Sequence, residues 1–566
     1  MFKRLIQPHA LLYQQLRPRA NRALHCNGIH TQSGKWQSKR NGVTVATTFT
    51  GIGLLGTGML LYLDNDQLYY YAQTFRRSGT AVVTGAKIAL DYQWTLLRAS
   101  DVDKESAKSA CHKRSAERVL HILQTLGGIY IKWGQHLSSM VFVLPEEWTS
   151  TLAVLQDRCE CASSPEEIRH LVRVDLGQDL DSLFSYFDYE PIGVASLAQV
   201  HKAQLASTGE WVAVKIQHPK LDEFCRIDIN TVSWIFDTIQ SIFPNFGFYW
   251  VAEDMRESLP QELDFTVEAA NAHKVSEQFA GDRTALVIPE VLWAKRRIIC
   301  MEYIHGVRID DLNYMKKHKI DPSTVSTELI SIFSRMMFIH GFVHCDPHPG
   351  NVMIRASNDN PSGHNFDIVL LDHGVYRTLP DELRVNYAHL WTALIEGDEE
   401  GIQRYCELVG GSDHRLFASM LTGREWHTIR SANLSSARTT TEVDRVANKP
   451  TMHFLRRIAD ILSSLPRVML LLLKTGDLLR NVDELLRNAS KPEQYRTYAI
   501  MGQFCAKAVW VETKQRISEK AATAGVSWQL VKHFAVAWWK YHRLEYSLWA
   551  YNVHSTLRQK LSINFL

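Results

Sequence analysis

Two short stretches decide the fold, HCDPHPGN at residues 344–351 and LLDHG at residues 370–374. Between them lie two short apolar runs, at 352–354 and 368–371, which the polar residues 355–364 connect. Apolar runs of this length on either side of a polar turn predict a β-hairpin. The two stretches are therefore expected to lie on adjacent loops at one end of that hairpin.

The side chains on these loops suit chemistry on phosphate groups. Phosphoryl transfer needs carboxylates and an amide around a divalent metal ion, with one acid directed at the acceptor hydroxyl. We expect Asp346 to orient the acceptor, and Asn351 and Asp372 to hold Mg²⁺. Gly374 would let the backbone turn beside the metal. An Asp with an Asn five residues later is common by itself, but its combination with a hairpin and Asp-x-Gly is specific.

A lysine inside an apolar strand is the next candidate. The segment WVAVKIQ at 211–217 contains Lys215 and follows a hairpin rich in Gly, Ala and Ser at 191–201. An edge-strand lysine that points to solvent is the structural alternative, but the preceding loop favours a lysine that reaches the α- and β-phosphates of a nucleotide. The loop residues expected to contact the nucleotide are Gly193, Ala195, Ser196 and Ala198.

Lys215 needs a carboxylate to orient it. The segment QELDFTVE at 261–268, in the helical region after the strand, offers Glu262 and Glu268. We favour Glu262 slightly and keep Glu268 as the alternative.

Apolar periodicity divides the chain into three parts. Residues 66–158 have apolar residues at helical spacing, whereas short β-branched runs appear from about residue 187. Helical stretches near 226–242 and 252–280 are interleaved with these runs, and from about residue 320 the chain is mainly helical. The pattern predicts a mixed α/β (α+β) fold with two lobes behind a helical N-terminal extension.

The N-terminal segment indicates a cellular address. Residues 1–42 contain eight Lys and Arg and no Asp or Glu, in a chain whose net charge is +3. Leucines interleaved with scattered arginines predict a mitochondrial presequence, with a nucleic-acid-binding arm and a solvated tail as alternatives.

Residues 43–63 form a run of 21 uncharged residues. At 1.5 Å per residue this run can cross a hydrocarbon core of ~30 Å, so it predicts one transmembrane helix, with a buried core helix as the alternative. Asp64 and Asp66 follow it directly. Because basic segments stay on the matrix side, we expect a single-pass inner-membrane protein whose body faces the intermembrane space.

Cysteine usage argues against a zinc or disulfide framework. The chain has 566 residues, enough for two or more packed units, and its 9 cysteines form no CxxC pair. Cys159 and Cys161 are too isolated to supply the four ligands of a zinc site. We expect free thiols that are mostly buried.

Two features near the C-terminus are open to interpretation. The apolar run at 465–473 is too short to span a membrane and predicts a core helix. Residues 526–551 are rich in Trp and Tyr, with Lys532, Lys540 and Arg543 among them. This composition suits a membrane interface, and packing against the rest of the protein is an equal alternative.

Taken together, these motifs resemble the UbiB family of aarF-domain-containing, coenzyme-Q-linked kinase-like proteins. The resemblance covers roughly residues 110–400, with weaker similarity to about 490. The matching motifs occur in order: Lys132-Trp-Gly134-Gln135, the Ala-rich loop around Ala195–Ala198, Val212-Ala-Val-Lys215, Glu262-Leu-Asp264, His344 to Asn351, and Asp372-His-Gly374.

The resemblance implies a two-lobed atypical protein-kinase-like fold that uses ATP and Mg²⁺. It implies that the helix with Lys132 and Gln135 covers the nucleotide site and that Lys132 contacts the Glu262/Asp264 motif. These four residues join Lys215 and Asp346 as expected catalytic residues. It also implies a mitochondrial member tied to coenzyme Q distribution and lipid homeostasis. The implied partners are mitochondrial membrane lipids, with coenzyme Q or a precursor as one candidate, and no nucleic acid.

Departures from ordinary protein kinases bear on the substrate. Residues 344–346 lack the arginine that reads a phosphorylated activation loop, and only seven residues separate Asp372 from Pro380. Three hypotheses remain open: an ATPase or a kinase for a small molecule or lipid, a nucleotide-regulated lipid-binding or lipid-extracting protein without phosphotransfer, and a conventional protein kinase, which is disfavoured.

The expected domain organisation follows from these features. It consists of a presequence (1–42), a transmembrane helix (43–63), a helical extension (64–186), a kinase-like N-lobe (187–310), a kinase-like C-lobe (311–490) and an aromatic helical region (491–566).

Overall fold

The computed structural model describes residues 65–98, 104–138, 144–156, 162–219, 221–242, 249–358, 360–431, 461, 464–486 and 495–563. The predicted presequence and the predicted transmembrane helix lie outside these residues. Within them, no helix is long and apolar enough to cross a membrane. Contacts divide the chain into two units, Met1–Tyr71 and Ala72–Leu566. Of the first unit the structure describes residues 65–71, which begin helix α2 (Asn65–Arg98).

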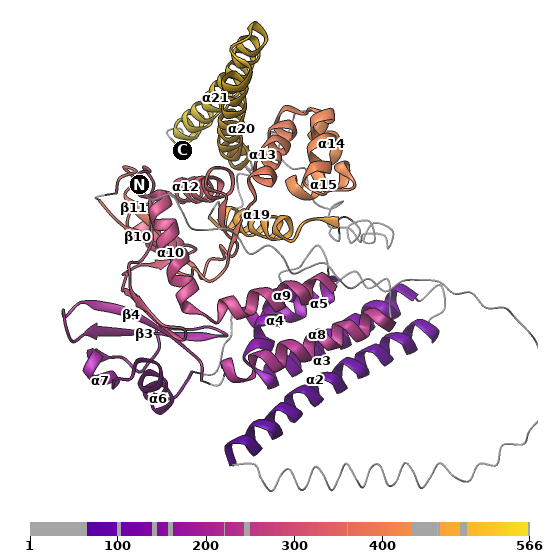
Figure 1. Cartoon of the computed structure of the whole chain (residues 1–566), viewed down its shortest axis with the longest axis vertical. Helices are drawn as coiled ribbons and strands as arrows, with labels where there is room; N and C mark the ends of the chain where they lie inside the picture. The colour runs from indigo at the N-terminus through magenta and orange to yellow at the C-terminus, as the bar shows by residue number, and fades with distance from the viewer. Residues whose placement is uncertain are drawn as a thin grey trace, which may run out of the picture. The chain divides into compact units, whose positions relative to one another are not determined.

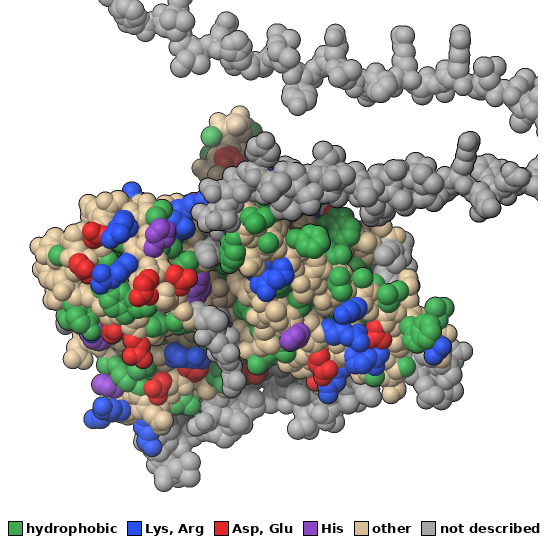
Figure 2. All heavy atoms as spheres, turned by 90° about the horizontal axis from the view of Figure 1, so that it is seen from below, with side chains coloured by type: hydrophobic (Ala, Val, Ile, Leu, Met, Phe, Trp, Pro, Cys, Tyr) green, Lys and Arg blue, Asp and Glu red, His purple; other side chains and the backbone are tan. Residues whose placement is uncertain are grey.

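The extension that follows is helical, as predicted, but it is broken into several helices. After α2 come α3 (Lys104–Leu126), α4 (Ile129–Ser138), α5 (Glu146–Leu152), α6 (Pro165–Leu176) and α7 (Leu180–Leu183). Gly127 and Gly128 separate α3 from α4 because both adopt positive φ angles, which side chains with a Cβ rarely tolerate. Figure 2 shows the face of the molecule seen from below, on which hydrophobic side chains lie among both basic and acidic ones.

The N-lobe is a 6-stranded antiparallel sheet in the order β1-β3-β4-β7-β6, with β2 paired to β3. On one side of β4 (Trp211–Gln217), Val212, Val214 and Ile216 pack with residues of α6. Ala213 packs on the other side against Phe265. The remaining strands are β1 (Phe184–Phe187), β2 (Gly193–Val194), β3 (Ala198–Leu205), β6 (Val291–Ala294) and β7 (Ile298–Glu302).

Three helices are inserted after β4: α8 (Leu221–Ile242), α9 (Tyr249–Glu262) and α10 (Phe265–Phe279). The helical stretch expected near 252–280 is present, but it is divided into two helices at Asp264. The side chain of Asp264 accepts a hydrogen bond from the Thr266 amide and caps a new helix. Because the chain turns at this cap, Glu268 of α10 faces the sheet, whereas Glu262 at the end of α9 does not pair with Lys215. α8 and α9 share a buried cluster with α3 and α4.

The predicted hairpin around the site is present. β10 (Val352–Ala356) pairs antiparallel with β11 (Phe366–Leu370), and Val352 lies opposite Leu370. β11 also pairs parallel with β5 (Leu286–Val287), and β10 pairs with β8 (Val307–Arg308). Separately, β9 (Phe342–His344) pairs with β12 (Tyr376–Thr378). This pairing brings together the chain just before the loop with Asp346 and the chain just after the loop with Asp372.

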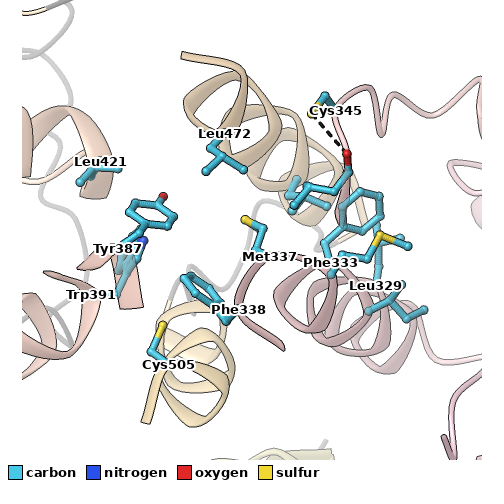
Figure 3. Packing of buried hydrophobic residues seen from close by; sticks show 14 of the residues in the cluster. Leu329, Phe333, Met337, Phe338, Cys345, Tyr387, Trp391, Leu421, Leu472 and Cys505 are labelled. Carbon is cyan, nitrogen blue, oxygen red and sulfur yellow. Dashed lines mark hydrogen bonds between the residues drawn. The ribbon is translucent and has the colours of Figure 1, made fainter. Parts of the chain in front are cut away.

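The C-lobe is helical around the largest buried cluster. Figure 3 shows side chains of α12, α13, α19 and α20 in this core, together with Cys345 from the loop after β9. Figure 1 shows α20 and α21 as a long pair at the C-terminal end of the chain. The C-lobe helices are α11 (Leu312–Lys317), α12 (Pro322–Arg335), the π-helix η2 (Met336–His340), α13 (Asp381–Glu396), α14 (Glu399–Leu408), α15 (His414–Thr422), α16 (Trp426–Arg430), α19 (Arg467–Leu486), α20 (Tyr495–Ala524) and α21 (Trp528–Ile563).

Two expectations are confirmed here. The apolar run at 465–473 belongs to a core helix, since Met469, Leu471 and Leu472 of α19 are buried. The cysteines of the described residues are buried and in no disulfide, namely Cys111, Cys225, Cys300, Cys345, Cys406 and Cys505. The other three cysteines lie outside those residues.

Candidate functional site

Lys215 lies on the face of β4 that also carries Ala213 and packs against α10. Its Nζ atom is 2.8 Å from Oε1 and 2.9 Å from Oε2 of Glu268, which lies in the first turn of α10 and is buried. The same nitrogen is 3.6 Å from Oδ1 of Asp372. The preference for Glu262 as the partner of Lys215 is therefore wrong. Phe265 packs on the sheet, and three residues later Glu268 lies on the same face of α10.

Lys215 is held in its charged form. Burial lowers the pKa of its ammonium group, but the Asp372 and Glu268 carboxylates outweigh burial and raise that pKa to about 12. A fixed ammonium group of this kind forms strong charge-assisted hydrogen bonds with phosphate oxygens.

Lys132 of α4 meets the other acidic residue. Its Nζ atom is 2.8 Å from Oε2 of Glu262, the last residue of α9, which confirms the expected contact with Glu262. Asp264 is not its partner, because that carboxylate accepts hydrogen bonds from the amide and hydroxyl of Thr266. Burial lowers the pKa of Lys132, but Glu262, Asp346 and Asp372 outweigh it and hold the pKa above its ordinary value.

Gln135, one turn further along α4, joins this helix to the Ala-rich loop. Its Nε2 donates to the Leu155 carbonyl at 2.9 Å, and its Oε1 accepts from the Ser196 hydroxyl at 3.2 Å. Gly134 allows the approach, since a Cβ added there would lie 2.2 Å from Cδ1 of Leu155 and 2.7 Å from Cδ1 of Leu123. In the Lys-x-Gly-Gln motif, Lys132 therefore forms the ion pair, Gly134 permits close packing, and Gln135 forms the hydrogen bonds.

The Ala-rich loop is a tight turn between β2 and β3. The Ala195 amide donates to the Ala198 carbonyl at 2.8 Å, so this N–H group is engaged within the turn. Ala198 is buried and begins β3. A Cβ added to Gly193 would meet no atom within 4 Å. The structure brings Ser196 to Gln135, and it shows the Gly193 position open.

His344 connects the two loops that carry the predicted metal ligands. Its Nδ1 accepts a hydrogen bond from the Asp346 amide at 3.1 Å, so its Nε2 carries the proton and donates to the Asp372 carbonyl at 2.7 Å. Burial lowers the pKa of His344, which suits this neutral tautomer. Asn351 Nδ2 donates to the Asp346 carbonyl at 3.1 Å, and the Gly374 amide donates to Oδ1 of Asp372 at 2.9 Å.

A residue that we did not predict completes the site. Lys474 extends from α19, and its Nζ lies 3.2 Å from Oδ1 of Asp346, while Nε2 of His348 lies 3.8 Å from Oδ2. Burial raises the pKa of Asp346, but Lys474 and His348 outweigh it and hold that pKa well below its usual range. The available signal was a lysine directly after the apolar run at 465–473.

The donor groups fit a magnesium ion with bound phosphates. Mg²⁺ prefers one or two carboxylates, and it completes its octahedron with waters and phosphate oxygens. Asp372 has 39% of its side chain exposed and Asp346 has 20%, so both carboxylates can be reached. Because the Asn351 amide nitrogen faces the Asp346 carbonyl, its Oδ1 is the atom left for a metal ion. No cluster of three or more His, Cys, Asp or Glu suited to a metal occurs among the described residues.

Comparison with known proteins places these features in a family. The ABC1 atypical kinase-like domain matches residues 154–406. The ABC1 family protein MCP2 homolog of Schizosaccharomyces pombe is 42% identical over 79% of this chain and 81% of its own length. The ABC1 family protein MCP2 of Saccharomyces cerevisiae is 37% identical over 90% of this chain and 95% of its own. AarF domain-containing protein kinase 1 of Mus musculus is 37% identical over 90% and 93%.

A solved structure also matches. The complex of Rv3197 with erythromycin from Mycobacterium tuberculosis shares 22% identity, covers 67% of this chain and 95% of that chain, and gives a TM-score of 0.45.

Proposed function

The chain belongs to the ABC1, or aarF-domain, family of atypical kinase-like proteins, and from this premise we propose that it binds Mg-ATP and acts as an ATPase or as a kinase for a small molecule or lipid. Lys215 would bind the α- and β-phosphates, oriented by Glu268. Asn351 and Asp372 would hold Mg²⁺, which would neutralise phosphate charge. Asp346 would direct the attacking hydroxyl or water.

One observation carries this proposal. Lys215 lies within 3.6 Å of both Glu268 and Asp372, although the three residues come from a strand, a helix and a loop. A buried lysine with two carboxylates is a costly arrangement unless it serves a ligand, because each charge loses its hydration. The His344 bridge between the Asp346 and Asp372 loops supports the same reading.

A conventional protein kinase is disfavoured. After Asp372 the chain forms β12 (Tyr376–Thr378), and α13 begins at Asp381. No room is left for an activation segment on which a peptide substrate could lie.

A nucleotide-regulated lipid-binding or lipid-extracting protein is the second candidate. The ion pair of Lys132 with Glu262 holds α4 against the end of α9, and the hydrogen bond of Ser196 with Gln135 holds it against the Ala-rich loop. A helix held in this position restricts access of a large acceptor, such as a peptide, to the nucleotide site. This favours a protein in which bound nucleotide regulates lipid binding.

We also propose a location in the inner mitochondrial membrane, with the body in the intermembrane space, and a role in coenzyme Q distribution and lipid homeostasis. The basic, acid-free residues 1–42 and the uncharged residues 43–63 support this location. In mitoplasts, external protease should digest the body of the protein. Protection of the body in intact mitoplasts would contradict the proposed orientation.

Nucleotide binding is tested by a thermal-shift titration of the full chain with Mg-ATP. Ligand at 100 times its dissociation constant should add about 2.7 kcal/mol to the free energy of unfolding, or roughly a few degrees in melting temperature. Lys215→Ala and Asp372→Asn should each reduce the shift. An equal shift in all three proteins would contradict the site, and a shift without phosphate release would favour the second candidate.

A further inference from the structure

Helix α21 has two different apolar faces. One face packs on α20, where Trp510 stacks on Tyr541 with ring centres 5.7 Å apart and contacts Phe534 at 5.4 Å. Leu530, Ala537 and Leu544 share the helical spacing of Phe534 and Tyr541 and are partly buried. This packing and the contact of Arg543 with Glu396 of α13, at 3.2 Å, attach α21 to the C-lobe.

The second face carries large aromatic side chains in solvent. At about 100° per residue, its members fall within an arc of roughly 100° that is centred well away from the packed face. A surface helix ordinarily has one apolar stripe and charged residues opposite. The exposed fractions on this face are Trp528 81%, Val531 43%, Trp538 45%, Trp539 63%, Tyr546 68% and Trp549 59%.

The charged residues beside this aromatic face are mostly basic. At about 100° per residue, Lys532 and Arg543 fall within roughly 40° of one edge of this face, and Lys540 falls between Arg543 and the packed face. Glu545, the acidic residue among the described side chains of α21, falls near the opposite edge. Tryptophan and tyrosine are the residues that prefer the headgroup region of a bilayer, and lysines beside them attract anionic headgroups.

From this arrangement we propose that the aromatic face of α21 is a docking surface for an anionic phospholipid bilayer, on which the helix lies parallel to the membrane plane. The inference rests on the membrane location proposed above and adds the surface and the lipid class. A parallel orientation follows because α21 is not apolar enough to cross a membrane.

The test uses an environment-sensitive fluorophore on the full chain. Trp539→Cys is labelled with NBD, and the signal of the labelled unmodified chain is subtracted because native cysteines also react. The protein is reconstituted into vesicles of phosphatidylcholine alone or with phosphatidylglycerol, each with brominated acyl chains as quencher. We expect a blue shift and strong quenching in the anionic vesicles. A label at Gln515→Cys, on an exposed part of α20, should stay in water in both.

Charge is tested separately. In the double variant Lys532→Ala and Lys540→Ala, the equilibrium constant for docking should fall roughly tenfold. The label at Trp539→Cys should then report a more aqueous environment. Lys514→Ala with Lys520→Ala changes the net charge equally on α20 and should have little effect. A label at position 539 that stays in water with every vesicle overturns the proposal. So does a label that becomes buried without lipid as protein concentration rises, since the face would then bind a second copy. Neither result depends on nucleotide binding.

Discussion

At the scale of single residues, the site depends on which carboxylate each buried lysine meets. Lys215 pairs with Glu268, and Lys132 pairs with Glu262. Both lysines are also close enough to Asp372 for its charge to raise their pKa values. Two ion pairs therefore surround the predicted metal ligand, and each can be removed without the other.

Glu268→Gln should weaken Mg-ATP binding by about tenfold or more, because the charge-assisted bond that orients Lys215 is lost. Calorimetric titration of the full chain measures the change in Kd. Glu262→Gln is the matched control: it keeps the Lys215 pair and frees Lys132, so ATP affinity should change much less. The reverse order of the two effects would restore Glu262 as the partner of Lys215.

Lys474→Met should lower the turnover of ATP by about a hundredfold, because a positive charge 3.2 Å from Asp346 acts where negative charge develops during phosphoryl transfer. Affinity for Mg-ADP should stay near that of the wild type, since no terminal phosphate is present. Lys474→Arg keeps the charge and should recover part of the rate. A loss of ADP binding together with turnover would indicate that Lys474 acts through the packing of α19.

At the scale of elements, the contact of α4 with its neighbours depends on a glycine. Gly134→Ala should destabilise the protein by about 1–3 kcal/mol, because the new methyl group overlaps Leu155 and Leu123. This cost exceeds the gain of about 1 kcal/mol that alanine normally brings to a helix. Urea unfolding monitored by circular dichroism measures the change.

Gly476→Ala in α19 is the control for this substitution. A Cβ at position 476 would have no atom within 4 Å, so alanine should be neutral or stabilising. If Gly134→Ala were equally harmless, the close approach of α4 to Leu155 would be wrong.

At the scale of the whole molecule, one buried ion pair attaches α2 to the body. Arg77 contacts Asp228 of α8 at 2.5 Å and donates to the Leu126 carbonyl at 2.7 Å, just before α4 begins. The rings of Tyr130 and Phe224 lie 5.4 Å from its guanidinium group. This contact links the helix that follows the predicted membrane span to the helix that carries Lys132.

Arg77→Ala should cost about 3 kcal/mol or more, since it leaves the Asp228 carboxylate buried without its partner. Hydrogen exchange of residues 72–98 should become faster before the rest of the chain unfolds. Arg76→Ala removes a neighbouring exposed arginine and should change neither quantity. Unchanged exchange in Arg77→Ala would show that apolar packing alone holds α2.

The sequence alone determined the order of the motifs, the hairpin between Asn351 and Asp372, the strand that holds Lys215 and the core helix after residue 465. These features follow from the spacing of apolar and turn residues over a few positions, which backbone geometry makes a local property. The break at Asp264 was missed because its cap competes with an otherwise continuous helical pattern.

Tertiary structure alone decided which groups meet. Lys215 and Glu268 are 53 residues apart, Ser196 and Gln135 are 61 apart, and Lys474 and Asp346 are 128 apart. The choice of Glu268 over Glu262 depends on how α9 and α10 turn against the sheet, and the approach of Lys474 depends on where α19 packs in the C-lobe core. Contacts between distant segments depend on the packing of whole elements, and the periodicity of either segment alone contains no information about that packing.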